Sequence, residues 1–130
     1  MSPVSINKLT PVLVVPAIEP CLPFWVDRLG FTKATEVPEG DKLGFVILVK
    51  DGVEVMYQSV ESVRKDIPSL AGVPRGGTVL YIEAGDIGAI ETAVKGLEVV
   101  VPRRKTFYGA EEIGVREPGG NAVIFGHHTG

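Results

Sequence analysis

The sequence predicts an α+β fold in which two βαβββ modules form a half-open pair of sheets around a cleft. The observations behind this prediction are the order of the apolar segments, a glycine-rich linker at mid-chain, and motifs that recur at a nearly fixed distance. PVLVV at Pro11 and TVLYI at Thr78 lie 67 residues apart, and GFVILVKDGVEVMY at Gly44 lies 70 residues before GVREPGGNAVIF at Gly114. Two copies of one unit explain both distances.

The first module opens with a strand and a helix. LTPVLVV (9–15) is short and β-branched, and its proline suits an edge strand because Pro11 has no N–H to pair. IEPCLPFWVDRLG (18–30) follows as a helix with Pro20 in its first turn and with Trp25 packed in the core. Cys21 is expected to be a buried structural thiol in the same helix.

Three strands complete the first module, and the second module repeats the order. The first three are FTKATEV, KLGFVILVK and VEVMYQSV, and Asp51-Gly52 forms a hairpin turn between the last two. After a short helical segment (60–68) and the glycine-rich linker, a strand at 78–84 leads to a helix that Asp86 caps. The remaining strands are expected in LEVVVP, in KTFYG running into EEIGVRE, and in NAVIFG.

The composition fits one compact domain. With 130 residues, 45% of them hydrophobic, the chain has enough apolar material for one core and hardly for two. We therefore expect a single domain over 1–130, with modules at 8–60 and 77–126 joined by a linker at 61–76.

Charge and apolar patterning exclude several classes of function. The net charge is -3, and the basic run Arg103 to Lys105 is interpreted as a solvated strand end, so nucleic-acid binding is not expected. No apolar run approaches the roughly 18 residues that a membrane span needs, and no secretory signal is recognisable. A single cysteine permits no internal disulfide. The expected location is the cytoplasm.

Two motifs carry a resemblance to a known family. PFWVDRLGF (23–31) resembles the first-helix signature of the vicinal oxygen chelate superfamily, which includes glyoxalase I, extradiol dioxygenases and bleomycin-resistance proteins. YGAEEIGVREPGGNAVIF (108–125) is similar to the closing motif of that superfamily. The Phe24-Trp25 pair most resembles the bleomycin-resistance branch.

The resemblance also implies where metal-using members hold their ion. The matching positions in this sequence are Thr10, Val79, Ile124 and, depending on the register of the fourth strand, Glu54 or Met56. One carboxylate without a histidine does not make the shell that divalent transition metals need. We therefore expect neither a metal nor another cofactor.

The adjacent histidines near the end of the chain do not change this expectation. His127 and His128 point to opposite faces of any strand, so they cannot both face one ion. We interpret them as a solvated tail.

Strand four supplies the first candidate ligand-binding residues. The period of two turns Glu54, Met56 and Gln58 toward the cleft and leaves Val55 and Tyr57 to pack against helices. Met56 fits core filling equally well, and Gln58 can alternatively lie in water at the strand end.

The second module supplies the remaining candidates. Tyr81 lies on the inner face, and the resemblance implies that Phe107 or Tyr108 stacks on a flat ligand, although an aromatic residue there can equally anchor a pair of strands. Glu112 suits a cationic ligand, although it and Glu111 also fit exposed acids that favour solubility.

These features favour a metal-free small-molecule binding protein of the bleomycin-resistance type. We expect a homodimer that sequesters a flat or cationic ligand between paired sheets, without catalytic residues. The alternative is an enzyme, a glyoxalase-like lyase or isomerase or a dioxygenase, with a metal held by Glu54, Glu83 or Glu112 together with His127 or His128.

Overall fold

Two four-stranded mixed sheets form the framework of the computed structural model, which describes residues 4–128. The first sheet has the order β1-β4-β3-β2, and its strands are β1 (Val12–Val15), β4 (Val53–Ser59), β3 (Lys42–Lys50) and β2 (Thr32–Glu39). The second has the order β5-β8-β7-β6, and its strands are β5 (Val79–Glu83), β8 (Ala122–His128), β7 (Ala110–Arg116) and β6 (Val99–Lys105). The same order in both sheets confirms the predicted α+β fold of two βαβββ modules.

The turn and cap predictions agree with the structure. β1 is an edge strand, as Pro11 just before it indicates. Asp51 and Gly52 have φ values of 48° and 81°, the left-handed conformation that a tight two-residue hairpin needs. Asp86 accepts a hydrogen bond from the amide of Ala89 and so caps α2 (Ile87–Ala93).

The predicted first helix is a succession of two short turns instead of one α-helix. A 3-10 turn, η1 (Glu19–Cys21), leads into a π-helical segment, η2 (Pro23–Arg28). Pro20 and Pro23 explain the break, because neither has an N–H to donate to the preceding turn. The helical segment after β4 is α1 (Val60–Asp66), followed by η3 (Pro68–Leu70).

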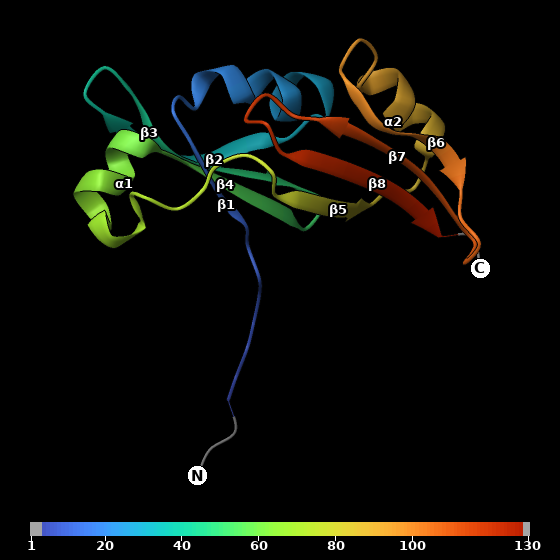
Figure 1. The fold of residues 1–130 in the computed structure, drawn as a ribbon, viewed down its shortest axis with the longest axis horizontal. Coiled ribbons are helices and arrows are strands. Elements are labelled where there is room, and N and C mark those ends of the chain that lie inside the picture. Colours follow the sequence, from blue (N-terminus) through green and yellow to red (C-terminus); the bar gives the residue numbers. More distant parts are fainter. Residues whose placement is uncertain (1–3, 129–130) are drawn as a thin grey trace.

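The apolar core lies between the helical segments and one face of each sheet. Figure 1 shows the segment that contains η1 and η2 on the same side as α2, while residues 4–9 leave the opposite side as an extended arm. Trp25 and Cys21 are buried at 0% and 2% exposure, which confirms both core predictions. Burial raises the pKa of the Cys21 thiol to about 12, so this thiol stays protonated near neutral pH.

A buried polar network connects the two modules within this core. The Trp25 indole donates to the Tyr57 hydroxyl at 2.8 Å, and that hydroxyl donates to Glu117 at 2.6 Å. Glu117 also accepts hydrogen bonds from the amide of Gly119 and from the amide and side chain of Asn121. The EPGGN turn is therefore folded around its own glutamate.

The histidines near the end of the chain do not form a solvated tail. Both belong to β8, where His127 lies opposite Glu111 and His128 lies opposite Ala110. The prediction was wrong because β7 continues far enough to pair with them. No helix among residues 4–128 has the length and apolar character needed to cross a membrane.

Candidate functional site

The face of each sheet that points away from η1, η2 and α2 (Figure 1) carries the predicted inner residues. In the first sheet β1 and β4 run parallel with Val12 opposite Met56, and in the second sheet Tyr81 lies opposite Ile124. The intervening residues Val55 and Tyr57 are buried at 2% and 0% exposure, which confirms the predicted alternation of β4.

Two donors hold Glu54 near the start of β4, an interior strand of the first sheet. The Thr10 hydroxyl donates to Glu54 Oε1 at 2.9 Å, and the Lys8 ammonium lies 3.1 Å from the same oxygen. The hydrogen bonds from Lys8 and from Thr10 hold the pKa of Glu54 below its usual value.

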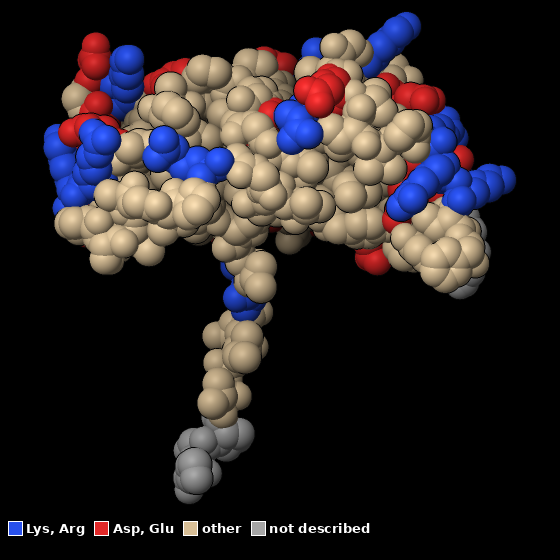
Figure 2. All heavy atoms as spheres, in the orientation of Figure 1, with Lys and Arg blue, Asp and Glu red and all other residues tan. Residues whose placement is uncertain are grey.

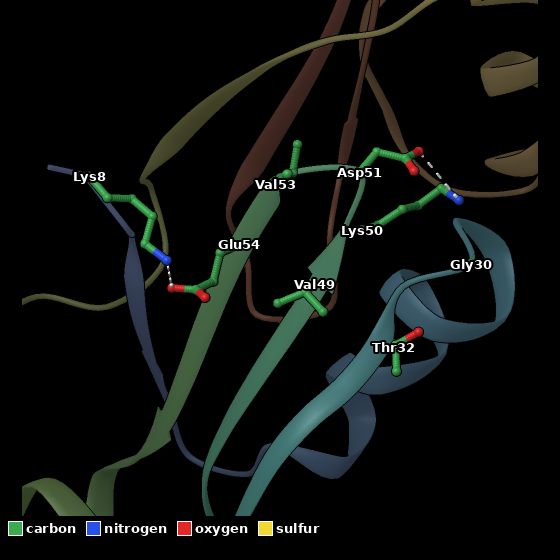
Figure 3. A pocket seen from close by; sticks show the side chains of 9 residues that line it. Lys8, Gly30, Thr32, Val49, Lys50, Asp51, Val53 and Glu54 are labelled. Carbon is green, nitrogen blue, oxygen red and sulfur yellow. Dashed lines mark ion pairs between the residues drawn. The ribbon is translucent and has the colours of Figure 1, made fainter.

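A hollow of about 500 Å³ adjoins this carboxylate. Figure 3 shows Lys8 pointing at Glu54 from the extended arm, with Val49 and Thr32 on the neighbouring strands. We call this space the Glu54 hollow; its lining residues are Lys8, Gly30, Thr32, Val49, Lys50, Asp51, Gly52, Val53 and Glu54.

A second cluster gathers around Glu112 on the second sheet. The hydroxyls of Tyr81 and Tyr108 each donate to Glu112 Oε2 at 2.8 Å. Arg104 donates to Oε1 from Nε at 3.1 Å and from Nη2 at 2.9 Å. Glu112 itself is only 1% exposed, so the interpretation as an exposed acid was wrong: the tyrosines and the arginine cover it.

Tyr81 reaches Glu112 by crossing over Gly126. Gly126 lies opposite Glu112 in the β7–β8 pair, and a Cβ at this position would overlap the Tyr81 hydroxyl. The absence of a side chain on Gly126 therefore permits the contact.

The hydrogen bonds of this cluster shift the acidity of its members. Burial by itself raises the pKa of Glu112, but the hydrogen bonds from Tyr81, Tyr108 and Arg104 outweigh burial and lower it below its usual value. Desolvation and the hydrogen bond to Glu112 raise the pKa of Tyr81 to about 12. The hydrogen bond to Glu112 also raises the pKa of Tyr108.

Aromatic rings surround the cluster and remain accessible. Tyr81 is 45% exposed, Tyr108 is 52% exposed and Phe107 is fully exposed. The imidazole of His128 stacks on Tyr108 with ring centroids 6.4 Å apart, and its Nε2 lies 3.1 Å from the Tyr81 hydroxyl. The surroundings of Glu112 thus offer flat aromatic surfaces beside a buried negative charge.

Basic side chains also gather around the end of β6. Figure 2 shows them with acidic side chains beside them. Arg103 pairs with Glu91 and Glu111, and Arg104 pairs with Glu112, so two members of the basic run are engaged in ion pairs instead of lying free in water.

The seven predicted ligand-binding residues fall into three environments. Glu54 and Met56 lie on the first sheet, and Met56 is half-buried. Gln58 is 8% exposed, so it does not lie in water at the strand end, and its amide donates to Ser62 and Asp66. The second sheet and the loop after β6 hold the remaining four, namely Tyr81, Phe107, Tyr108 and Glu112.

The residues at the implied metal positions do not fit a metal ion. Thr10 binds Glu54 directly, while Val79 and Ile124 have no donor atom in their side chains. Across residues 4–128, no three His, Cys, Asp or Glu side chains lie close enough together to hold a metal. One hydroxyl and one carboxylate, already hydrogen-bonded to each other, do not make up the set of nitrogen, sulfur or oxygen ligands that a transition metal requires.

The structure adds three residues that sequence reasoning did not assign to the site, because Lys8, Arg104 and Gly126 contact candidate residues directly. His128, which the sequence suggested only as a metal ligand of the alternative enzyme, packs on Tyr81 and Tyr108. Only Gly126 carried a local signal, since a glycine inside an apolar strand indicates a close approach of another group.

Comparisons with known proteins agree with this architecture. Neither a protein-family model nor a curated protein matches the sequence. Among solved structures, a glyoxalase/bleomycin resistance protein/dioxygenase from Nocardioides is 25% identical, with 97% of this chain and 86% of that chain covered at a TM-score of 0.72.

Two further solved structures have the same fold and different names. A bleomycin-binding protein from bleomycin-producing Streptomyces verticillus, complexed with copper(II)-bleomycin, is 24% identical over 98% of both chains at a TM-score of 0.63. A lactoylglutathione lyase from Agrobacterium tumefaciens is 18% identical, covers 97% of this chain and 95% of that chain, and has a TM-score of 0.70. With its paired βαβββ modules and these likenesses, the chain has the fold of the glyoxalase/bleomycin-resistance/dioxygenase proteins.

Proposed function

We propose that the protein is a metal-free binding protein of the bleomycin-resistance type, which sequesters a flat or cationic small molecule. The observation that carries this proposal is the chemistry at the four implied metal positions. Val79 and Ile124 are aliphatic. At the other two positions the Thr10 hydroxyl donates a hydrogen bond to Glu54, which also forms an ion pair with Lys8. A face with these residues suits recognition by stacking and charge better than metal-assisted chemistry.

The second sheet supplies the groups that would hold a flat ligand. Tyr81, Phe107 and Tyr108 expose their rings around Glu112, and aromatic side chains bind planar molecules at low entropic cost. Hydrogen bonds to Glu112 hold Tyr81 and Tyr108 in place, so the proposed surface is ordered before a ligand arrives.

A homodimer is part of the proposal. The open faces expose Val12 at 47% and Val79 at 62%, and the arm exposes Val4 and Ile6 at 87% and 84%. A second copy would cover this apolar surface and turn each open face into one wall of a cleft. The cytoplasm as the place of action also belongs to the proposal and rests on the sequence.

Calorimetric titration with metal-free bleomycin tests the binding function. Saturable binding by the wild type, weakened about tenfold or more in Tyr108→Ala, would support the proposal, since a stacked ring contributes on the order of 1–3 kcal/mol. Leu70→Ala is the matched control, because Leu70 is a comparably exposed apolar residue on η3. Monomeric behaviour in sedimentation at the concentrations used would contradict the cleft.

Metal analysis separates the proposal from an enzymatic function. Tag-free protein is dialysed against zinc, nickel, manganese and iron(II) and then analysed for bound metal. Near-stoichiometric metal that disappears in Glu54→Gln would overturn the proposal and favour a glyoxalase-like lyase or a dioxygenase. In a binding protein, Glu54→Gln changes only the affinity for the small molecule.

A further inference from the structure

Only one of the two carboxylate oxygens of Glu54 has a donor beside it. Thr10 and Lys8 both approach Oε1, and no donor among residues 4–128 approaches Oε2. Figure 3 shows this second oxygen on the side away from Lys8. The Glu54 side chain is 18% exposed, so an incoming donor can reach it from the hollow.

The ion pair with Glu54 is nearly all that holds the Lys8 side chain at the hollow. The Lys8 side chain is 60% exposed. Its ion pair with Glu54 is the single polar contact between residues 4–9 and the rest of the described chain. Ion pairs this exposed typically stabilise a structure by 1 kcal/mol or less, so Lys8 can be exchanged at small cost.

The remainder of the hollow suits an alkyl group that ends in a cation. Val49 and Val53 line it with aliphatic surface, and Thr32 adds a hydroxyl. The cations Lys8 and Lys50 stand at its sides, and Lys50 lies 3.7 Å from Asp51. Glu54 therefore keeps one carboxylate oxygen for a charge-assisted hydrogen bond from a ligand.

From this geometry we propose that the Glu54 hollow is an alkylammonium site that the chain fills with its own Lys8. An ammonium group of a bound molecule replaces Lys8 on Glu54 and thereby releases the arm at residues 4–9. This inference rests on the proposed function in one respect, which is that the natural ligand carries a cationic group. Lys8 then acts as a tethered competitor that sets the affinity threshold of the site.

The inference predicts tighter binding when the competitor is removed. The probe is n-butylammonium, which reproduces the end of a lysine side chain, and the readout is the backbone amide chemical shifts of Thr10, Val53 and Glu54. Lys8→Ala should bind the probe saturably and about two- to fivefold more tightly than the wild type, the range that an exposed ion pair accounts for.

Two further variants test whether the tighter binding depends on Glu54 and on the loss of Lys8 in particular. The double variant Lys8→Ala with Glu54→Gln should lose the saturable shift, because no carboxylate remains in the hollow. Lys33→Ala removes another exposed ion pair, that with Glu36, and should titrate like the wild type.

Several outcomes would overturn the inference: equal affinity in the wild type and Lys8→Ala, a shift that survives Glu54→Gln, or no saturable shift in Lys8→Ala. None of these results depends on bleomycin binding. A failure of the lysine exchange is therefore distinguishable from a failure of the proposed function.

Discussion

The hydroxyl of Tyr57 donates a 2.6 Å hydrogen bond to Glu117, and this bond joins β4 of the first sheet to the turn between β7 and β8 of the second. The same hydroxyl accepts from the Trp25 indole. All three residues are at most 1% exposed, so their polar groups are paired with each other and with the protein instead of with bulk water. The contact therefore couples the two modules through their core.

Tyr57→Phe is expected to destabilise the protein by about 1–3 kcal/mol, because it leaves the Trp25 N–H and one Glu117 oxygen short of a partner in the core. Urea denaturation measures this loss. Glu98→Gln, which weakens an exposed ion pair with Arg116, is the control and should change stability by about 0.5 kcal/mol or less. Equal effects of the two substitutions would show that the buried bond is not important for stability.

Gly126→Ala is expected to displace Tyr81 from Glu112, because the new methyl group occupies the space of the Tyr81 hydroxyl. Overpacking of this kind typically costs about 1–3 kcal/mol. The side-chain NMR signals of Tyr81 and its hydrogen bond to Glu112 provide the measurement. Gly72→Ala is the control, since a Cβ there meets no atom within 4 Å. An unchanged Tyr81 environment in Gly126→Ala would refute the account of this glycine.

Most of the fold follows from local signals in the sequence. Asp51-Gly52 and Asp86 specify a turn and a cap through their own backbone preferences, so each could be predicted from a few residues. The division of the first helix between Pro20 and Pro23 is also a local effect, although an apolar pattern at helical spacing obscured it. The extension of β8 to His128 depends on β7 as its partner and has no local signal.

The sequence predicted several residues of the candidate site but not the contacts between them. Tyr81 and Glu112 follow from strand alternation and from the closing motif, whereas their hydrogen bond depends on the alignment of β5, β7 and β8. β6 pairs with β7 through two register shifts, and these bring Arg104 opposite Glu112. Lys8 lies in an arm outside the strands, where no strand alternation indicates which way its side chain points.

Glu112→Gln is expected to lower the pKa of Tyr81 from about 12 toward the usual tyrosine value near 10. The reason is that the hydroxyl then loses its bond to a carboxylate and no longer ionises next to a negative charge. The pKa of Tyr108 should fall as well. The measurement is a pH titration of the tyrosine Cζ chemical shifts. In the control Glu111→Gln, whose carboxylate pairs with Arg103, Tyr81 should titrate as in the wild type.

The lowered pKa of Glu112 also predicts how stability depends on acid. A carboxylate whose pKa is lower in the folded state stabilises the fold fully above its unfolded pKa, near 4.3 for glutamate. That contribution is lost as the pH falls through the lower folded value. The stability difference between the wild type and Glu112→Gln should therefore be constant above about pH 5 and shrink toward pH 3.

Urea unfolding between pH 6 and pH 3 measures this difference, and Tyr81→Phe provides an internal check. That substitution removes one of the donors that lower the pKa of Glu112, so the acid loss should be smaller than in the wild type and should be complete at a higher pH. If the curves of the wild type and Glu112→Gln run parallel throughout, Glu112 titrates alike in the folded and unfolded chains. The tyrosine and arginine contacts would then only offset the cost of burying its charged form.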